Sequence, residues 1–389
     1  MALTADLLRH SDEGRNVTNI ELFFDLVYVF AITQLSHHLL ARTTAIGALE
    51  TALLLAMVWL VWIYTTWVTN WLDPSRLPVR LMLVALMFGS LVMSAALPQA
   101  FAARGLWVGG AYAAMQIGRS IFAIAGMAGD RLQRNFERIL AWCVVSGALA
   151  VVGGFTHGWI RAGCWIGAVG FDVLGGAVGF YTPGLGRSST GEWTISGDHM
   201  AERCQAFLLI ALGESVVVIG STLSGFHNVS ATDVGTLIAT FVGVVLLWWV
   251  YFDRSADAGA SVVARSTDPG RLGRSAYHFV HPIMVAGIIV TAAADERVLA
   301  HPTAATDAST AWLVLGGTVL FLAGHAAFKA TLWRVVPCTR LVAIAVLGLL
   351  GLGATLLPVV ALGALADAVV VLLVVSDRKG ARQDSRNDA

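Results

Sequence analysis

Charged residues are scarce in this chain of 389 residues. They make up 13% of it, while 57% of the chain is hydrophobic and the mean hydropathy is +0.73. A soluble domain usually carries about 25% charged residues. The formal net charge is zero, so the composition gives no reason to expect nucleic acid as a partner. The composition predicts an integral membrane protein whose partner is the lipid bilayer.

Cysteine is also scarce, and the familiar enzyme motifs are missing. The four cysteines are scattered without a C-x-x-C pair, which favours packing residues over disulfides or metal ligands. The sequence has no H-E-x-x-H, no G-x-S-x-G, no P-loop and no G-x-G-x-x-G after a strand. We therefore expect no metal and no cofactor. The first sixteen residues are polar, which predicts a short cytoplasmic arm rather than a cleavable signal peptide.

Apolar stretches of membrane length repeat from end to end. About 20 apolar residues span a bilayer, and the stretch after residue 340 divides at Pro358 because proline ends or kinks a helix. The fold class is therefore an all-α integral membrane protein with about twelve transmembrane helices. The predicted spans are 17–41, 46–71, 79–103, 106–127, 135–156, 161–182, 200–224, 231–253, 276–299, 308–331, 339–356 and 358–375.

The distribution of lysine and arginine predicts the orientation. With twelve spans, 20 of the 25 basic residues fall on the side that holds both termini, and four fall on the other side. Arg119 lies inside a span. An excess of lysine and arginine marks the cytoplasmic side of a membrane protein. The sequence thus predicts a multi-pass protein of the cytoplasmic membrane with both termini in the cytoplasm.

A weak internal repeat suggests two halves. W-I-Y at 62–64 recurs as W-V-Y at 249–251, and Asp172 corresponds to Asp367 in the same order along the chain. Six spans are an even number, so the two six-helix repeats would have parallel orientation. The predicted organisation is an arm at 1–16, a first half at 17–182, a linker at 183–199, a second half at 200–375 and a charged, disordered cytoplasmic tail at 376–389.

Two carboxylates begin the first predicted helix. Glu21 and Asp25 are four residues apart and share one helix face. A carboxylate in hydrocarbon costs at least about 2.5 kcal/mol at the centre of a span, so this face should look into a helix bundle or a wet cavity. Together with other polar residues, Asp25 forms a layer roughly 9 to 21 Å below the cytoplasmic boundary. The layer consists of Asp25, Arg119, Asp172, Glu214, His325 and Asp367.

The layer has two interpretations. Carboxylates outnumber cations in it, so some must be protonated, hydrated or paired with a bound cation, which favours a proton- or cation-linked site. Alternatively the groups only hold helices together, with Arg119 pairing with Asp172 or Asp25 and His325 pairing with Asp367. Glu21 and Glu202 lie near helix starts, where a carboxylate also complements the helix dipole.

Two longer segments carry a family resemblance. The stretch ELFFDLVYVF at 21–30 resembles the first-span signature of the bacterial low temperature requirement protein A family, with Tyr28 where a phenylalanine is expected. The stretch H-M-A-E-R-x-x-x-F-x-x-I-x-L-G-E-S at 199–215 is similar to its mid-chain signature. The resemblance implies a polytopic protein of the bacterial inner membrane and no settled activity. It points to Glu21, Asp25, Glu202, Arg203 and Glu214.

The leading prediction is a secondary transporter that couples an unidentified small solute to protons or another cation. Asp25, Asp172, Glu214 and Asp367 would carry the ion, and Arg119 would be their charge partner. The full set of predicted binding residues is Glu21, Asp25, Arg119, Asp172, Glu202, Glu214, His325 and Asp367. The alternatives are an ion channel, whose pore ring the sequence does not display, and a lipid-handling membrane enzyme. The sequence does not specify the substrate, the coupling ion or the oligomeric state.

Overall fold

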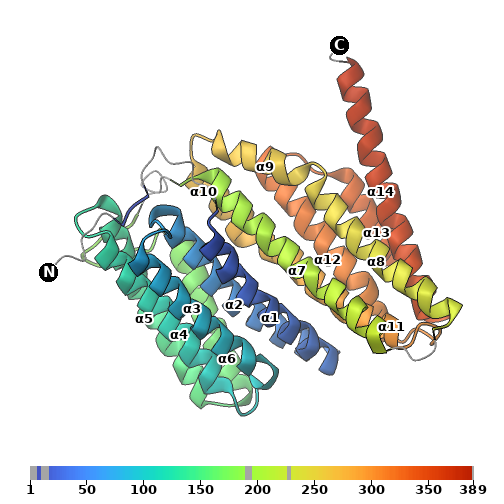
Figure 1. The fold of residues 1–389 in the computed structure, drawn as a ribbon, viewed down its shortest axis with the longest axis horizontal. Helices are drawn as coiled ribbons and strands as arrows, with labels where there is room; N and C mark the ends of the chain where they lie inside the picture. Colours follow the sequence, from blue (N-terminus) through green and yellow to red (C-terminus); the bar gives the residue numbers. More distant parts are fainter. Residues whose placement is uncertain (1–6, 10–16, 189–194, 226–228, 388–389) are drawn as a thin grey trace. The chain divides into compact units, whose positions relative to one another are not determined.

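The computed structural model describes residues 7–9, 17–188, 195–225 and 229–387, with side chains up to residue 379. These residues form helices and short turns, with no β-structure beyond isolated bridges, so the all-helical class is confirmed (Figure 1). The longer helices are α1 (Asn19–Ala41), α2 (Ala45–Trp71), α3 (Leu77–Ala96), α4 (Gly105–Gly126), α5 (Arg131–Phe155), α6 (Gly158–Ala177), α7 (Gly197–Gly225), α8 (Ala231–Phe252), α11 (His281–Ala300), α12 (Ala308–Trp333), α13 (Cys338–Leu352) and α14 (Val359–Asn387).

Eight helical segments in the described part of the chain are long and apolar enough to cross a membrane. These segments are Asn19–Ala41, Ala45–Trp71, Leu77–Gln99, Arg131–Phe155, Gly197–Gly225, Ala231–Ala264, Ala308–Trp333 and Val359–Lys379. Backbone polar groups have no water to bind in hydrocarbon, so a helix, which satisfies them internally, is the fitting structure for such segments. The chain is a multi-pass membrane protein.

Each of the twelve predicted windows coincides with a helix. Four of these helices are not among the eight that are long and apolar enough to cross a membrane. Helices α4, α6 and α11 are too polar, and α13 has only 15 residues. Polar side chains along their length, such as Arg119, Asp172 and Asp295, lower the apolarity of the first three. The prediction of several membrane helices is confirmed, whereas the number twelve and the internal repeat stay predictions.

One compact unit comprises Met1–His38, Ala45–Phe207 and Ala260–Arg274. In it α4 packs against α3 and α5, and α5 packs against α6 (Figure 1). Glycine permits the closest approach, because a Cβ on Gly109 would lie 2.1 Å from the carbonyl oxygen of Ala150. Helix α2 contacts both α4 and α6, and its second half is almost completely buried. This burial places α2 among the polar residues described below.

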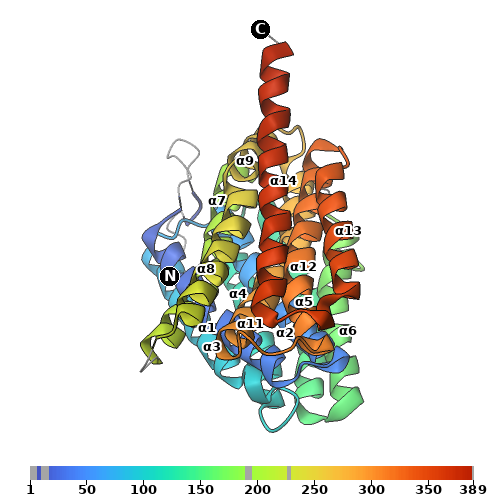
Figure 2. The same cartoon turned by 90° about the vertical axis from the view of Figure 1, so that its right-hand side faces the viewer.

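The other compact unit comprises Leu39–Thr44, Leu208–Gly259 and Ser275–Ala389. Here α11 packs along α12, and α14 lies against α8, α12 and α13 (Figure 2). A Cβ on Gly287 would lie 2.5 Å from the backbone nitrogen of Phe321, so α11 and α12 also approach closely through glycine. The predicted boundaries of the two six-helix halves stay a prediction.

Helices also occur outside the predicted spans. The segment at 254–275, between two predicted spans, contains the short helices α9 (Ser255–Ala264) and α10 (Pro269–Gly273). The tail from residue 376 is not disordered as predicted, since α14 continues to Asn387. Extending an existing helix avoids the cost of nucleation, and arginine, lysine, glutamine and alanine all favour helix. The charge of the tail is therefore compatible with helix.

Candidate functional site

Glu21 and Asp25 lie on one face of α1, as their four-residue spacing predicts, and both side chains are fully buried. Other positions of the same helix expose Phe23 and Leu26. The amide and the hydroxyl of Thr18 donate hydrogen bonds to Oε2 of Glu21 at 2.9 and 2.8 Å. Glu21 thus contributes to the helix start, as half of a capping box, and still turns one oxygen toward α7.

Arg203 of α7 connects the two carboxylates of α1. Its Nε and Nη2 donate to the two oxygens of Asp25 at 2.9 and 2.6 Å, and its Nη1 donates to Glu21 Oε1 at 3.1 Å. Two residues of α2 complete the arrangement: Thr69 accepts from Nη1 at 3.2 Å, and the Trp62 indole donates to Asp25 at 2.7 Å. The bidentate geometry is the strong form of an arginine–carboxylate pair.

His199 joins the cluster as a neutral ring. The Ser196 amide donates to Oδ1 of Asn70 at 2.9 Å, which fixes the orientation of the Asn70 amide. Nδ2 of Asn70 then donates to Nδ1 of His199 at 3.2 Å, so Nδ1 is an acceptor and the ring proton is on Nε2. Nε2 donates to Glu21 Oε1 at 2.8 Å. The tautomer follows from the backbone of Ser196.

Arg9 supplies the second cation of the cluster. The short segment around it pairs with the end of α2 through hydrogen bonds from the Arg9 amide to Trp71 O and from the Asp73 amide to Leu7 O, both 2.8 Å long. Nη2 of Arg9 donates to Glu21 Oε2 at 3.0 Å. Two carboxylates and two guanidiniums give the cluster no net charge, which is how ionised groups persist in a low-dielectric interior.

A second buried cluster surrounds Asp172 of α6. The hydroxyl of Tyr112 and the side-chain amide of Gln116, both on α4, donate to Oδ2 of Asp172, the amide at 2.9 Å. The Tyr64 hydroxyl of α2 donates to the Asp172 backbone carbonyl at 3.0 Å. Arg119 donates to the carbonyl end of Gln116. Neutral groups therefore separate Asp172 from Arg119, and Asp172 has no ion pair among the described residues.

Arg119 is fully buried without contacting a carboxylate in the described part of the chain. Its Nη1 donates to the Val61 carbonyl at 3.2 Å and to the Thr65 hydroxyl at 3.4 Å, both on α2. Its guanidinium carbon lies 5.2 Å from the centre of the Tyr64 ring, a cation–π contact. Neither predicted pairing of Arg119 forms among the described residues: Gln116 stands between Arg119 and Asp172, and Asp25 pairs with Arg203 instead.

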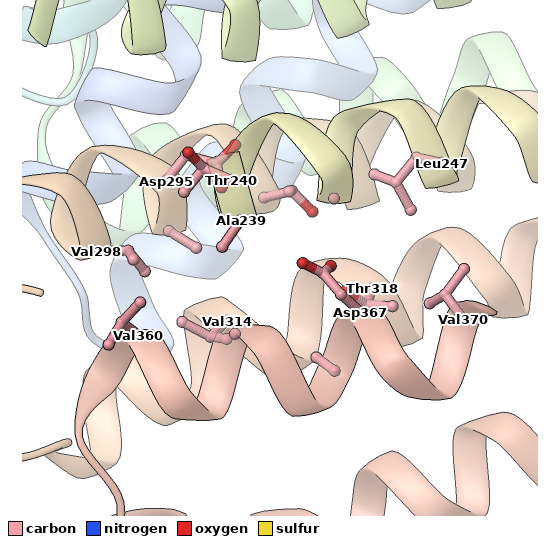
Figure 3. Close-up of a pocket in the computed structure, with 15 residues that line it drawn as sticks. Ala239, Thr240, Leu247, Asp295, Val298, Val314, Thr318, Val360, Asp367 and Val370 are labelled. Atoms are coloured by element: carbon pink, nitrogen blue, oxygen red, sulfur yellow. The ribbon is translucent and has the colours of Figure 1, made fainter. Parts of the chain in front are cut away.

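In the other unit, Asp367 of α14 lines a cavity of about 50 Å³ together with Asp295 of α11 (Figure 3). Thr240 of α8 and Thr318 of α12 lie beside these carboxylates, and apolar side chains form the remaining wall. The predicted partner of Asp367, His325, is elsewhere: its Nε2 lies 2.9 Å from the Ser255 hydroxyl. Asp295 was not predicted as a site residue.

Among the described residues, no group of three or more histidine, cysteine, aspartate or glutamate side chains is arranged to hold a metal ion. The clusters and the cavity described above bring carboxylates together with hydroxyl, amide, indole, imidazole and guanidinium groups. Such carboxylates can take up a proton or bind a cation through their oxygen atoms.

Comparison with known proteins identifies the family. The family model described as bacterial low temperature requirement A protein (LtrA) matches residues 16–375. The chain belongs to this family. It is 39% identical over 360 residues to an uncharacterized protein of Rhizobium meliloti (strain 1021), an alignment that covers 92% of this chain and 87% of the relative. No solved structure matches the chain.

The two signature segments of this LtrA protein meet in space. Glu21 and Asp25 from the first segment bind Arg203 from the second. Glu202 is exposed instead, and its Oε2 accepts from the Val17 amide at 3.2 Å. Glu214 is buried further along α7. The roles predicted for these residues in binding stay predictions.

Residues missing from the predicted set complete both clusters. Arg203 and Arg9 make the α1 cluster neutral, His199 donates to Glu21, and Tyr112 with Gln116 binds Asp172. A sequence signal existed for Arg203, which stands inside the mid-chain signature. Arg9 has no comparable signal, because an isolated arginine near a polar terminus resembles any cytoplasmic residue.

Proposed function

We propose that this LtrA family member is a proton- or cation-coupled secondary transporter of a small solute. In this proposal it lies in the bacterial inner membrane with twelve spans and both termini in the cytoplasm. The two halves would be parallel repeats that rock against each other in alternating access. The proposal specifies the solute only as a small molecule.

One observation carries the proposal: buried carboxylates without an ion pair occur in helices of a multi-pass membrane protein. Asp172 in α6 and Asp295 in α11 are both more than nine-tenths buried, and neither makes an ion pair among the described residues. An ionised carboxylate in such surroundings is unfavourable, so the group takes up a proton or binds a cation. Reversible binding of that kind is what an ion-coupled transporter needs.

The contacts of Asp25 argue for a different role. Arg203 binds both of its oxygens, and the Trp62 indole binds one of them, so a proton or metal ion would have to displace a guanidinium. This favours the structural alternative for Asp25 and Glu21. The proposed carriers are therefore Asp172, Glu214 and Asp367, with Asp295 added.

The test is ion flux in proteoliposomes that contain the purified protein and a pH-sensitive dye. Amino acids, sugars, organic acids and amines would be added one at a time, with and without an imposed potential. Saturable proton or cation movement that depends on one solute is expected. Asp172→Asn should remove the coupled movement, while Asp257→Asn, an exposed position in α9, should leave it unchanged.

Two results would refute the proposal. Large potential-driven flux without any added solute would indicate a channel instead. The second result is an absence of flux under every condition, from protein that is well folded by circular dichroism and elutes as a single species. This result would refute transport and favour a lipid-handling enzyme.

A further inference from the structure

Among the described residues, the lining of the cavity in the second unit presents carboxylate and hydroxyl oxygens and no cationic side chain to an occupant. It lies among α8, α11, α12 and α14, and its polar lining consists of Asp295, Asp367 and three threonines (Figure 3). No lysine, arginine or histidine is among the described residues that line it. With about 10–15 Å³ needed per water molecule, the space of about 50 Å³ has room for roughly three to five waters.

The hydroxyl protons of two of the three threonines, Thr240 and Thr291, are already in use. Thr240 donates to the carbonyls of Thr236 and Leu237 in its own helix, at 3.0 and 3.1 Å. Thr291 donates to the Gly287 carbonyl at 3.0 Å. A hydroxyl that donates backwards along its helix presents oxygen lone pairs to the cavity. The occupant must therefore bring the positive charge or the donors.

Asp295 has no cationic partner among the described residues, although the Ser215 hydroxyl lies near its carboxylate. The residue is only 7% exposed, and its Oδ2 is buried without a hydrogen-bond partner. Its charged neighbour is another carboxylate, Asp367. A buried carboxylate oxygen left unsatisfied beside a like charge is unfavourable.

Asp367 stands at the edge of this cavity. Its side chain is partly exposed, whereas Asp295 is buried. A Cβ on Gly243 would lie 3.0 Å from Oδ1 of Asp367, so the carboxylate lies close to the backbone of α8. An ion that reaches Asp367 therefore lies at the rim of the same cavity that Asp295 lines.

We infer that this cavity binds a small monovalent metal cation of the size of Na⁺, held by the carboxylates of Asp295 and Asp367 and the hydroxyl oxygens of Thr240 and Thr291. The inference rests on the proposed function, because it names the ion that the transporter would couple. A hard divalent ion such as Ca²⁺ is the competing occupant, because it also takes oxygen ligands. Softer metals prefer nitrogen and sulfur ligands, which this lining lacks.

The test is Na⁺ binding to the purified full-length protein, measured by isothermal titration calorimetry in a choline buffer at neutral pH. A single saturable site per chain is expected. Asp295→Asn and Asp367→Asn should each weaken binding by about tenfold or more, the effect of losing one charged ligand. Thr240→Val, which keeps the shape of the side chain, should weaken it less. Asp257→Asn, an exposed carboxylate of the same unit, should bind as the unchanged protein does.

Several outcomes would overturn the inference. These are no heat of Na⁺ binding at any pH at which the protein is folded, binding that survives both aspartate substitutions, and tighter binding of Ca²⁺ than of Na⁺. If Asp295→Asn does not fold, Asp367→Asn and Thr240→Val decide the question. The measurement is also independent of transport: Na⁺ binding without flux would refute only the transporter, and proton-coupled flux without Na⁺ binding would refute only this site.

Discussion

Replacing Arg203 by methionine removes the only cation that contacts Asp25 among the described residues. Asp25 would keep a single donor, the Trp62 indole at 2.7 Å, in a site with no exposed surface. Breaking a buried ion pair by removing one partner costs about 3–5 kcal/mol. The two lost hydrogen bonds to Asp25, at about 1.5–3 kcal/mol each, give a similar sum. We expect Arg203→Met to lower the free energy of unfolding by about 3–5 kcal/mol.

The double variant Asp25→Asn with Arg203→Met separates the ion pair from simple packing. Removing both charges leaves no unpaired ion, and replacing a buried pair by neutral groups is often nearly neutral. The double variant should therefore be more stable than Arg203→Met alone. Arg76→Met is the matched control, because Arg76 makes an exposed pair with Asp73 at 3.4 Å. Such surface pairs contribute about 0–1 kcal/mol.

The free energies would be measured by titrating the protein from mixed micelles into sodium dodecyl sulfate and following tryptophan fluorescence, which the 13 tryptophans make sensitive. Polar contacts between transmembrane helices average only about 0.6 kcal/mol, because the unfolded helices find other partners in the membrane. A loss below about 1 kcal/mol for Arg203→Met would place this pair in that ordinary class. That result, or a double variant less stable than the single one, would refute the reasoning.

Three further predictions concern local contacts. Asn70→Ala removes the bonds that fix the His199 tautomer and should cost about 1–3 kcal/mol in the same unfolding assay. Gly287→Ala forces α11 away from α12 and should cost about 1–3 kcal/mol, whereas Gly348→Ala meets open space and should gain up to about 1 kcal/mol. Hydrogen bonds from Thr310 lower the pKa of Asp307, the residue that caps α12. The stability that Asp307 contributes is therefore present above the ordinary aspartate pKa and is lost as pH falls below it. The free energy of unfolding of Asp307→Ala should be lower than that of the unchanged protein at neutral pH, and the difference should shrink at acidic pH.

The helices could be predicted from the sequence because each is a long apolar window, a signal contained within some twenty neighbouring residues. The partners could not. Asp25 binds Arg203, which lies 178 positions away, and no spacing rule connects residues on separate helices. For the same reason both pairings proposed for Arg119 were compatible with the sequence. The packing of α2 against α4 instead gives Arg119 the Val61 carbonyl and the Thr65 hydroxyl as partners.

Asp295 illustrates a different limit. It stands near the end of its window and is followed by Glu296 and Arg297, a composition typical of the membrane interface. Its burial results from the tertiary packing of its own unit. The local sequence therefore gives no indication that Asp295 shares a cavity with Asp367.

The two groups of carboxylates differ in the number of cationic partners that they already have. Glu21 and Asp25 already receive two guanidiniums, so a bound proton would weaken contacts that hold α1 and α7 together. Asp295 and Asp367 have threonine oxygens and each other, so a cation relieves repulsion and satisfies an orphan oxygen. Neutralising the first group should therefore reduce stability, whereas neutralising the second should abolish ion binding and leave folding intact. A carboxylate without a cation destabilises a purely structural bundle, and its presence beside a cavity with room for several waters is the reason that we propose a bound cation there.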